Sequence, residues 1–407
     1  MAIRIWASVL LFWLGLAAQA TAAEPYTPAS DAEVLAKVPP RAAPGPSALA
    51  GLRQQLAARP DDPGLAARYA AEVIAVGRAS ADPRYFGYAQ AALSSWWSQA
   101  EPPAAVRLQR AILLQRQHQY AAALRDLDGL IAGGHDDPAA RLNRAAVHLA
   151  QGRAAEAQRD CAALIGKANL LIATTCLAAS GGVSGQAGPR YRSLLAMLAT
   201  PAAEDAAAGE RRWAWTVAAE LAVQQGLDAE ADRAFDQARA LAAAEAVDDV
   251  YLQAAWADHG LALGRTQEVA TVLKDSVAEV SLLRLALAGR RLAEQGDLAW
   301  QSRWPGIRDR LVVRFAQARE RGETGHGREE AMLALYLLDQ PAEALRLARD
   351  NWALQREPVD ARILLESARA TRDEATLIEV RDWLRSTRLE DPALRRLAGL
   401  APTEPGL

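Results

Sequence analysis

The amino-acid sequence predicts an all-α protein built as an α-solenoid of stacked helix pairs. Three observations lead to this prediction. The chain has 407 residues, 51% of them hydrophobic and 6% aromatic, and its wealth of Ala, Leu, Arg and Glu favours helix over strand. Turn signals recur about every 15 to 20 residues without sustained period-2 alternation. Small and aromatic residues also return at a spacing of about 34 residues.

The first 23 residues have the pattern of a secretory signal peptide. Arg4 precedes the apolar run Ile5–Ala18, which is too short to span a membrane comfortably. Small residues follow, and we expect cleavage near Ala22 or Ala23. An uncleaved N-terminal anchor is the alternative.

Three further regions follow the signal peptide. Residues 24–46 form a Pro-rich lead, residues 47–400 the solenoid, and residues 401–407 a C-terminal tail. No later apolar run reaches spanning length, so we expect no stable membrane insertion after cleavage. The formal net charge is −3, which gives no global basic field and argues against a nucleic-acid partner.

The clearest repeat unit surrounds Trp215. Taking Trp215 as position 4 places Ala219 at position 8 and Gly226 at position 15. The later positions 20, 24 and 27 are Ala231, Phe235 and Ala238. Small residues let two helices approach closely, larger ones fill the remaining space, and glycine in the turn tolerates positive φ. The pattern resembles the tetratricopeptide repeat (TPR), a 34-residue helix–turn–helix.

The resemblance implies a right-handed superhelix whose concave face binds an extended peptide or a partner helix. A bundle of unrelated topology is the alternative. Further pairs are expected to begin near Gly64, Ala104, Pro138, Ile172, Val250, Ser281, Gly325 and Val359, with a capping helix at Pro392–Leu400. We also expect a helix over Pro83–Trp97, a long glycine-rich turn over Ser180–Gly188, and an interruption at Pro305–Gly306.

A closer resemblance concerns three segments. Asp82–Leu93, followed by Trp96-Trp97, is similar to a segment of a family of exported TPR proteins from Gram-negative bacteria. The pair Cys161 and Cys176 and the opening Ser30–Leu35 are similar to the same family. Together with the signal peptide and the Ala- and Arg-rich composition, this implies a bacterial protein located in the periplasm.

Cys161 and Cys176 are the two cysteines of the chain. The repeat register places Cys161 on the second helix of one pair and Cys176 on the first helix of the next, as antiparallel neighbours. We predict a disulfide, because paired cysteines in an exported chain are usually bonded. Buried free thiols, or a redox-active pair, are the alternatives. No histidine pair has metal-ligand spacing, so neither a metal site nor a cofactor is expected.

Aromatic and arginine side chains supply the candidate partner-binding residues, since Trp, Tyr and Arg dominate protein interfaces. These candidates are Tyr85, Tyr88, Trp96, Trp97, Trp300, Trp304, Arg303, Arg310, Arg314 and Arg321. The alternative for the aromatic residues is burial between helices, and for the arginines a solvated helix face.

The sequence holds no H-E-x-x-H or G-x-S-x-G motif, and we predict that the protein is not an enzyme. The Glu366-Ser367 pair resembles that of lytic transglycosylases, but the glycine-rich motif expected after it is absent. We predict a periplasmic scaffold or adaptor that binds an envelope protein or peptide along its concave face. The alternatives are a chaperone for maturation of an envelope metalloprotein or cytochrome, and a helical cell-wall hydrolase.

Overall fold

The computed structural model describes residues 46–80, 82–135, 137–323 and 325–401. The chain divides into two units, Met1–Ala43 and Pro44–Leu407, and we consider the second by itself. The expected signal peptide lies outside the described residues, as do the Pro-rich lead up to residue 45 and the tail beyond Ala401. Every regular element of the described residues is a helix, so the predicted all-α solenoid is confirmed.

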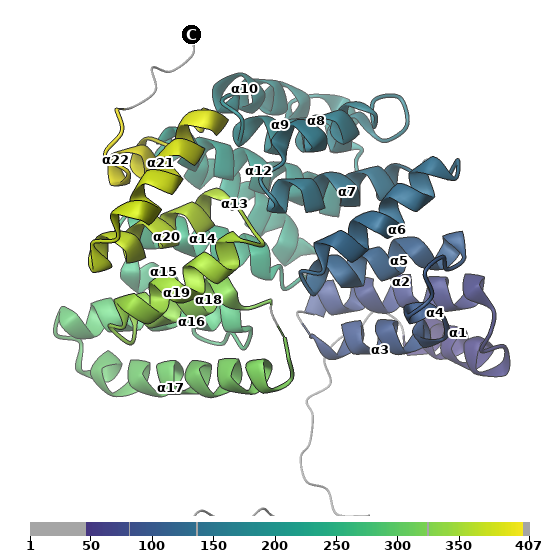
Figure 1. Cartoon of the computed structure of the whole chain (residues 1–407), viewed down its shortest axis with the longest axis horizontal. Coiled ribbons are helices and arrows are strands. Elements are labelled where there is room, and N and C mark those ends of the chain that lie inside the picture. Colours follow the sequence, from purple (N-terminus) through teal and green to yellow (C-terminus); the bar gives the residue numbers. More distant parts are fainter. Residues whose placement is uncertain (1–45, 81, 136, 324, 402–407) are drawn as a thin grey trace, which may run out of the picture. The chain divides into compact units, whose positions relative to one another are not determined.

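Twenty-two helices follow one another along the described residues and are joined by short turns (Figure 1). Their bounds are α1 (Pro46–Ala58), α2 (Pro63–Ser80), α3 (Arg84–Ala92), α4 (Ser94–Trp97), α5 (Ala104–Arg116), α6 (Tyr120–Ala132), α7 (Pro138–Ala150), α8 (Ala154–Ala162), α9 (Leu170–Gly182), α10 (Ala187–Leu198), α11 (Pro201–Glu204), α12 (Ala208–Gln225), α13 (Asp228–Ala244), α14 (Val250–Ala262), α15 (Thr266–Val272), α16 (Glu279–Glu294), α17 (Leu298–Glu320), α18 (Gly327–Tyr336), α19 (Pro341–Trp352), α20 (Pro358–Thr371), α21 (Glu374–Thr387) and α22 (Pro392–Leu397).

Helices α12 and α13 confirm the repeat register around Trp215. The alanines at its small positions, Ala219, Ala231 and Ala238, are all fully buried. Phe235 is buried beside them, as expected of a residue that fills the space left by small neighbours. The abundance of alanine therefore reflects close helix packing as well as helix propensity.

The turn inside each helix pair from α5 to α21 contains a residue with positive φ. Glycine supplies it in five pairs and another residue in three: Gly152, Gly185, Gly226, Gly264 and Gly296, then His118, Asp339 and Arg372. Glycine adopts this conformation without steric cost. The recurrence of one backbone conformation explains why the repeat survives large changes in sequence.

The glycine-rich segment Ser180–Gly188 is shorter as a turn than we predicted. Helix α9 continues through Gly182, and α10 begins at Ala187. Gly182 is there for packing, because a Cβ at this position would lie 2.4 Å from Cδ2 of Leu221 on α12. This helical glycine provides close approach between helices rather than a flexible loop.

Two other predicted helix boundaries were wrong. The predicted helix Pro83–Trp97 is divided at Leu93 into α3 and α4. Conversely, α17 runs without a break through Pro305. Proline removes the N–H that would bond the carbonyl of Gln301, and since Gln301 is exposed, water can satisfy that carbonyl.

The apolar core follows the chain as a series of clusters. Three smaller clusters cover residues 66–113, 111–147 and 145–176, and the largest covers residues 171–398. Each element thus packs mainly against its neighbours in sequence, as expected of a solenoid. None of the described helices is both long enough and apolar enough to cross a membrane.

Contacts between segments distant in sequence join the N-terminal helices to the C-terminal ones. The backbone N–H of Arg356 donates to the carbonyl of Ala150 at 2.8 Å, and that of Asp248 to Ala79 at 3.0 Å. The carboxylate of Glu390 accepts from the N–H of Ala187 at 2.9 Å, at the first turn of α10. A carboxylate is favourable there because the first amides of a helix lack intrahelical partners.

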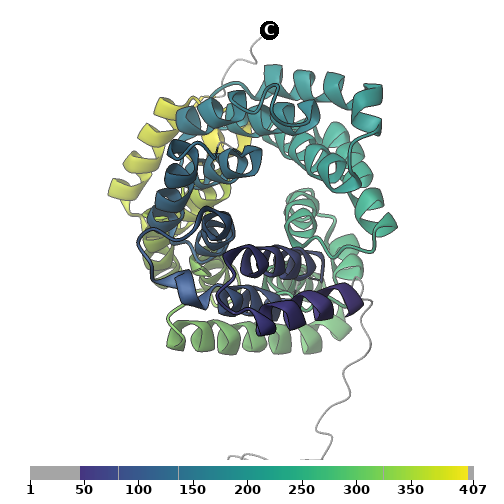
Figure 2. The same cartoon turned by 90° about the vertical axis from the view of Figure 1, so that its right-hand side faces the viewer.

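We call this set of contacts the seam: residues 79, 116–120, 150–152 and 185–188 against residues 248, 325, 355–357 and 388–390. Glu390 and Ala187 are 203 residues apart, which is close to about six repeats of 34 residues. Figure 2 shows the purple-to-blue N-terminal helices in front of the yellow-green C-terminal helices. The seam therefore joins successive turns of the superhelix.

Candidate functional site

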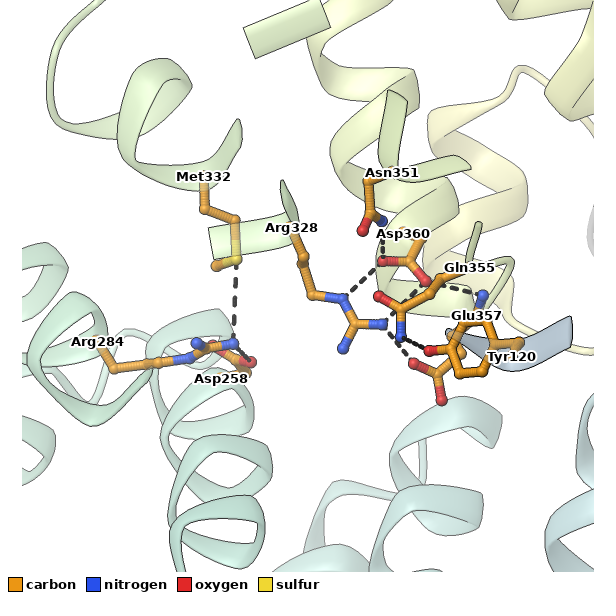
Figure 3. A network of polar contacts seen from close by, with 9 residues as sticks. All are labelled: Tyr120, Asp258, Arg284, Arg328, Met332, Asn351, Gln355, Glu357 and Asp360. Carbon is orange, nitrogen blue, oxygen red and sulfur yellow. Dashed lines mark hydrogen bonds and ion pairs between the residues drawn. The ribbon is translucent and has the colours of Figure 1, made fainter. Parts of the chain in front are cut away.

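Arg328, on the first turn of α18, is the centre of a network of polar side chains (Figure 3). Its Nε donates to Oδ1 of Asp360 at 2.6 Å and its Nη2 to Oδ2 of the same carboxylate at 2.9 Å. Nη2 also donates to Glu357. A bidentate arginine–carboxylate pair fixes both side chains in one orientation. We call these residues and those bonded to them the Arg328 network.

Asp360 is held in place by the local sequence of α20. Glu357 is the N-cap of this helix and Asp360 its third residue, and each accepts from the other's backbone N–H in a capping box. Asn351, at the end of α19, donates to Asp360 at 2.8 Å. Only 1% of the surface of Asp360 is exposed, so these hydrogen bonds take the place of water around its carboxylate.

Gln355, whose backbone N–H donates to the carbonyl of Asn351 at 2.7 Å, connects the Arg328 network to α6 across the seam. Nε2 of Gln355 donates to the hydroxyl of Tyr120 at 2.9 Å, and both side chains are buried. These two residues are 235 positions apart. This bond crosses the seam, whereas the bonds among Arg328, Asn351, Glu357 and Asp360 join α18, α19 and the start of α20.

A second arginine–carboxylate pair, with a buried arginine and a half-buried aspartate, lies beside the first. Arg284 on α16 donates from Nε and Nη2 to the two oxygens of Asp258 on α14, at 2.9 and 2.7 Å. Its Nη2 also lies 4.0 Å from the sulfur of Met332 on α18, as drawn in Figure 3. The first helices of three pairs thus contribute to one polar region of the solenoid.

Tyr251, at the start of α14, is the most accessible aromatic residue near this region. Its side chain is 60% exposed, and its hydroxyl donates to Glu220 on α12. The surrounding protein and the carboxylates of Glu220 and Glu357 raise the pKa of Tyr251. Burial and the charge of Glu357 also raise the pKa of Glu220 to about 7. We call Tyr251 and Glu220, together with Glu357 and Arg328 whose charges act on Tyr251, the Tyr251 surface.

The charged groups of the Tyr251 surface shift one another's pKa values. Burial alone would lower the pKa of Arg328, but Glu357 and Asp360 raise it well above its ordinary value. Arg328 therefore stays charged, and it offsets part of the negative charge facing Tyr251. Such fixed donors, acceptors and an oriented aromatic ring are suited to recognising a peptide. Among the described residues, no group of three or more His, Cys, Asp or Glu is arranged to hold a metal ion.

The predicted arginine and tryptophan residues on and just after α17 differ in their surroundings. Trp300 is buried, which corrects the prediction that it contacts a partner, and Arg303 covers its ring. Trp304 is half-buried and lines a pocket of about 520 Å³ with Arg308. Arg321 forms an ion pair with Glu323 at 2.6 Å.

Arg303, Arg310 and Arg314 lie together along one face of α17. Arg303 donates to the carbonyl of Lys274 at 3.1 Å and Arg314 to that of Val277 at 2.8 Å. Arg310 is exposed. The structure thus brings these three predicted residues together, next to the loop between α15 and α16.

The predicted aromatic cluster at α3 and α4 is largely part of the core. Trp96 is buried, which corrects its assignment as a partner-binding residue. Trp97 and Tyr85 are half-buried and pack against the first core cluster. Tyr88 is 51% exposed and lies edge-on to Tyr85 at 5.8 Å. Burial between helices, the alternative interpretation, therefore holds for most of this cluster.

The predicted disulfide is present. Cys161 on α8 and Cys176 on α9 are bonded, with Cα atoms 5.3 Å apart. Both residues are buried. The repeat register had placed them on neighbouring antiparallel helices of successive pairs, which is where they lie.

The Tyr251 surface and the Arg328 network were not identified from the sequence. Tyr251, Arg328 and Asp360 belong to three different helix pairs, so no local motif connects them. The capping-box pair Glu357 and Asp360 was the one local signal available. It marks the start of a helix, and it does not reveal that Arg328 binds both carboxylates.

Comparison with solved structures shows a distant likeness to a helical-repeat domain. The chain is 16% identical to the TPR domain of P58(IPK), and the match covers 87% of this chain and 96% of that one, with a TM-score of 0.22. No protein-family model matches the chain, and no curated protein matches it. The interpretation as helix repeats therefore depends on the helix pairs and turns described above.

Proposed function

We propose that this protein is a periplasmic interaction scaffold that holds a partner protein or peptide at the Tyr251 surface. The observation that carries the proposal is the side chain of Tyr251, which is 60% exposed and bonded to Glu220. Tyrosine is enriched among residues that dominate binding energy. A side chain already fixed by a hydrogen bond loses little conformational entropy when a partner binds.

The way the surrounding groups are held also supports the proposed scaffold role. Arg328 and Glu357 are bonded to each other, and Asp360 fixes the position of both. A partner would meet a surface whose orientation changes little on binding, which favours affinity through preorganisation. The seam supports this rigidity because Gln355 bonds Tyr120 on a distant helix.

The periplasmic location is supported by two observations of different kinds. The first 23 residues have signal-peptide character, and Cys161 and Cys176 form a disulfide. Disulfides persist in oxidising compartments such as the bacterial periplasm. Cell fractionation tests this part: the mature chain should appear in the periplasmic fraction, shortened by the signal peptide, and a full-length cytoplasmic chain would contradict it.

The binding role can be tested by native purification of tagged variants with crosslinking and mass spectrometry. We expect the wild-type protein to retain a stoichiometric envelope protein and Tyr251→Ala to lose it. Tyr88→Ala is the matched control, since it removes another tyrosine that is about half exposed. Crosslinks should map to α12, α14 and α18. A partner retained equally by Tyr251→Ala would show that this surface is not the binding site.

A further inference from the structure

Helix α17 has one side built into the core and another that the described residues leave uncovered. Ile307, Leu311 and Phe315 are buried on the first side. On the other side, Val313 is 55% exposed and Val312 is 38% exposed. Exposed valines on a helix are ordinary when isolated, so their meaning depends on the side chains beside them.

Three arginines along α17, two of which line a hollow with Val313, have no carboxylate partner among the described residues. Arg303 and Arg314 donate to backbone carbonyls of the α15–α16 loop, which are neutral. Arg310 is exposed and forms no ion pair within the described part of the chain. The nearest acid in sequence, Asp309, is paired with Arg308 at 2.9 Å. The uncovered side of α17 therefore carries uncompensated positive charge.

Charge and apolar surface meet at a shallow hollow. A space of about 360 Å³ is lined by Gly306, Asp309, Arg310, Val313 and Arg314. These positions follow helical spacing along one face of α17. Gly306 leaves the hollow open, because a Cβ there would meet no atom within 4 Å. Val277 on the neighbouring loop, 52% exposed, adds apolar area next to Arg314.

We infer that this face, the α17 surface, is a second docking site, and that it takes an acidic segment of a partner protein with aliphatic side chains between its carboxylates. Guanidinium groups bind carboxylates with paired, charge-assisted hydrogen bonds. The valines match aliphatic side chains of the same segment. This site uses none of the residues of the Tyr251 surface, so either proposed binding site can be disproved without affecting the other.

The mixture of charge and apolar area argues for a peptide over other anionic ligands. Phosphate-rich polymers and lipid headgroups gain from arginine but not from valine, and their binding depends mainly on the number of cations. An acidic peptide with aliphatic residues gains from both kinds of side chain. Substitution of a valine therefore separates these ligands as clearly as substitution of an arginine.

The test uses the whole mature protein and a short fluorescein-labelled peptide in which pairs of Glu alternate with pairs of Leu. A peptide with Gln in place of Glu serves as the reference ligand. We expect saturable binding of the Glu peptide by fluorescence anisotropy, about tenfold weakened in the double variant Arg310→Glu/Arg314→Glu. Val313→Ser should weaken it as well, by a smaller factor. Arg125→Glu is the control, since Arg125 is an exposed arginine on α6.

Several results would overturn the inference. The inference fails if the Glu peptide shows no saturable binding, if the Gln peptide binds equally well, or if the double arginine variant binds the Glu peptide with unchanged affinity. Insensitivity to Val313→Ser together with equal binding of anionic vesicles would assign the face to a general anion attraction instead. Tyr251→Ala should leave peptide affinity unchanged, and loss of binding in that variant would mean that the peptide occupies the Tyr251 surface.

Discussion

Arg328 and Arg310 lie on neighbouring pairs of the solenoid, and their surroundings are opposite. Arg328 donates to Asp360 and Glu357 at the seam. Arg310 is exposed on α17 beside an exposed valine. A charge withdrawn from water needs a partner from the same chain, whereas a charge left in water is stable alone and remains available to another molecule. The Arg328 network thus joins neighbouring helix pairs of the protein, and the α17 surface is free to bind.

The largest expected effect comes from removing Asp360. Asp360→Ala leaves Arg328 and Asn351 without their shared acceptor, and breaking such a buried pair costs about 3 kcal/mol of unfolding free energy. Urea unfolding followed by circular dichroism would measure it. Asp382→Ala is the control, because its pair with Arg385 is exposed on both sides and should change stability by less than about 0.5 kcal/mol. Equal costs would remove the contrast between buried and exposed pairs.

A smaller loss of stability is expected when a side chain is added at the packed seam. Gly185 and Gly226 both have positive φ, so an alanine at either is strained by about 1 kcal/mol. A Cβ on Gly185 would also lie 2.8 Å from Cβ of Arg388, while a Cβ on Gly226 would meet nothing within 4 Å. We expect Gly185→Ala to lower the unfolding free energy by about 2 kcal/mol in total. Backbone amides near Arg388 should also exchange hydrogen faster in Gly185→Ala, but not in Gly226→Ala.

The seam should also respond to acid through His118. Burial, followed by the charge of Arg328, lowers the pKa of His118 to about 4, and Arg116, His326 and Asp360 face the same ring. Between its unfolded pKa near 6.5 and this value, the folded state binds fewer protons than the unfolded state. Stability should therefore fall as pH decreases from 6.5 toward 4.

His118→Gln removes this source of pH dependence. We expect wild-type stability to fall more than that of the variant between pH 7 and pH 5, by about 1 kcal/mol. His135→Gln, at an exposed histidine, should keep the wild-type profile. Thermal unfolding at several pH values would measure the difference, and identical profiles for wild type and His118→Gln would exclude His118 as the group responsible.

The smallest effect on stability is expected from a substitution on the α17 surface. Arg310→Glu changes the unfolding free energy by no more than about 0.5 kcal/mol, because an exposed side chain without buried contacts has little to lose. The same substitution contributes to the loss of acidic-peptide binding described above. A large loss of stability in this variant would show that Arg310 supports the fold, and the contrast with Arg328 would fail.

Much of the local structure was predictable from the sequence. Helices α5, α7 and α14 begin at the predicted residues Ala104, Pro138 and Val250. The buried alanines of the Trp215 repeat followed from the register, and the disulfide followed from the register together with the expected export of the chain. These features depend on helix periodicity, capping and turn conformation, all of which act over a few neighbouring residues.

The tertiary structure decided which charges are buried and which remain free. No sequence pattern distinguishes Arg328 from Arg310, since both are arginines in ordinary helical segments. Their difference arises because the stacking of the next helix pair places Glu357 and Asp360 against Arg328, and that placement depends on the geometry between successive pairs. Sequence determined the units, and the accumulated geometry of their stacking determined the network, the Tyr251 surface and the exposed face of α17.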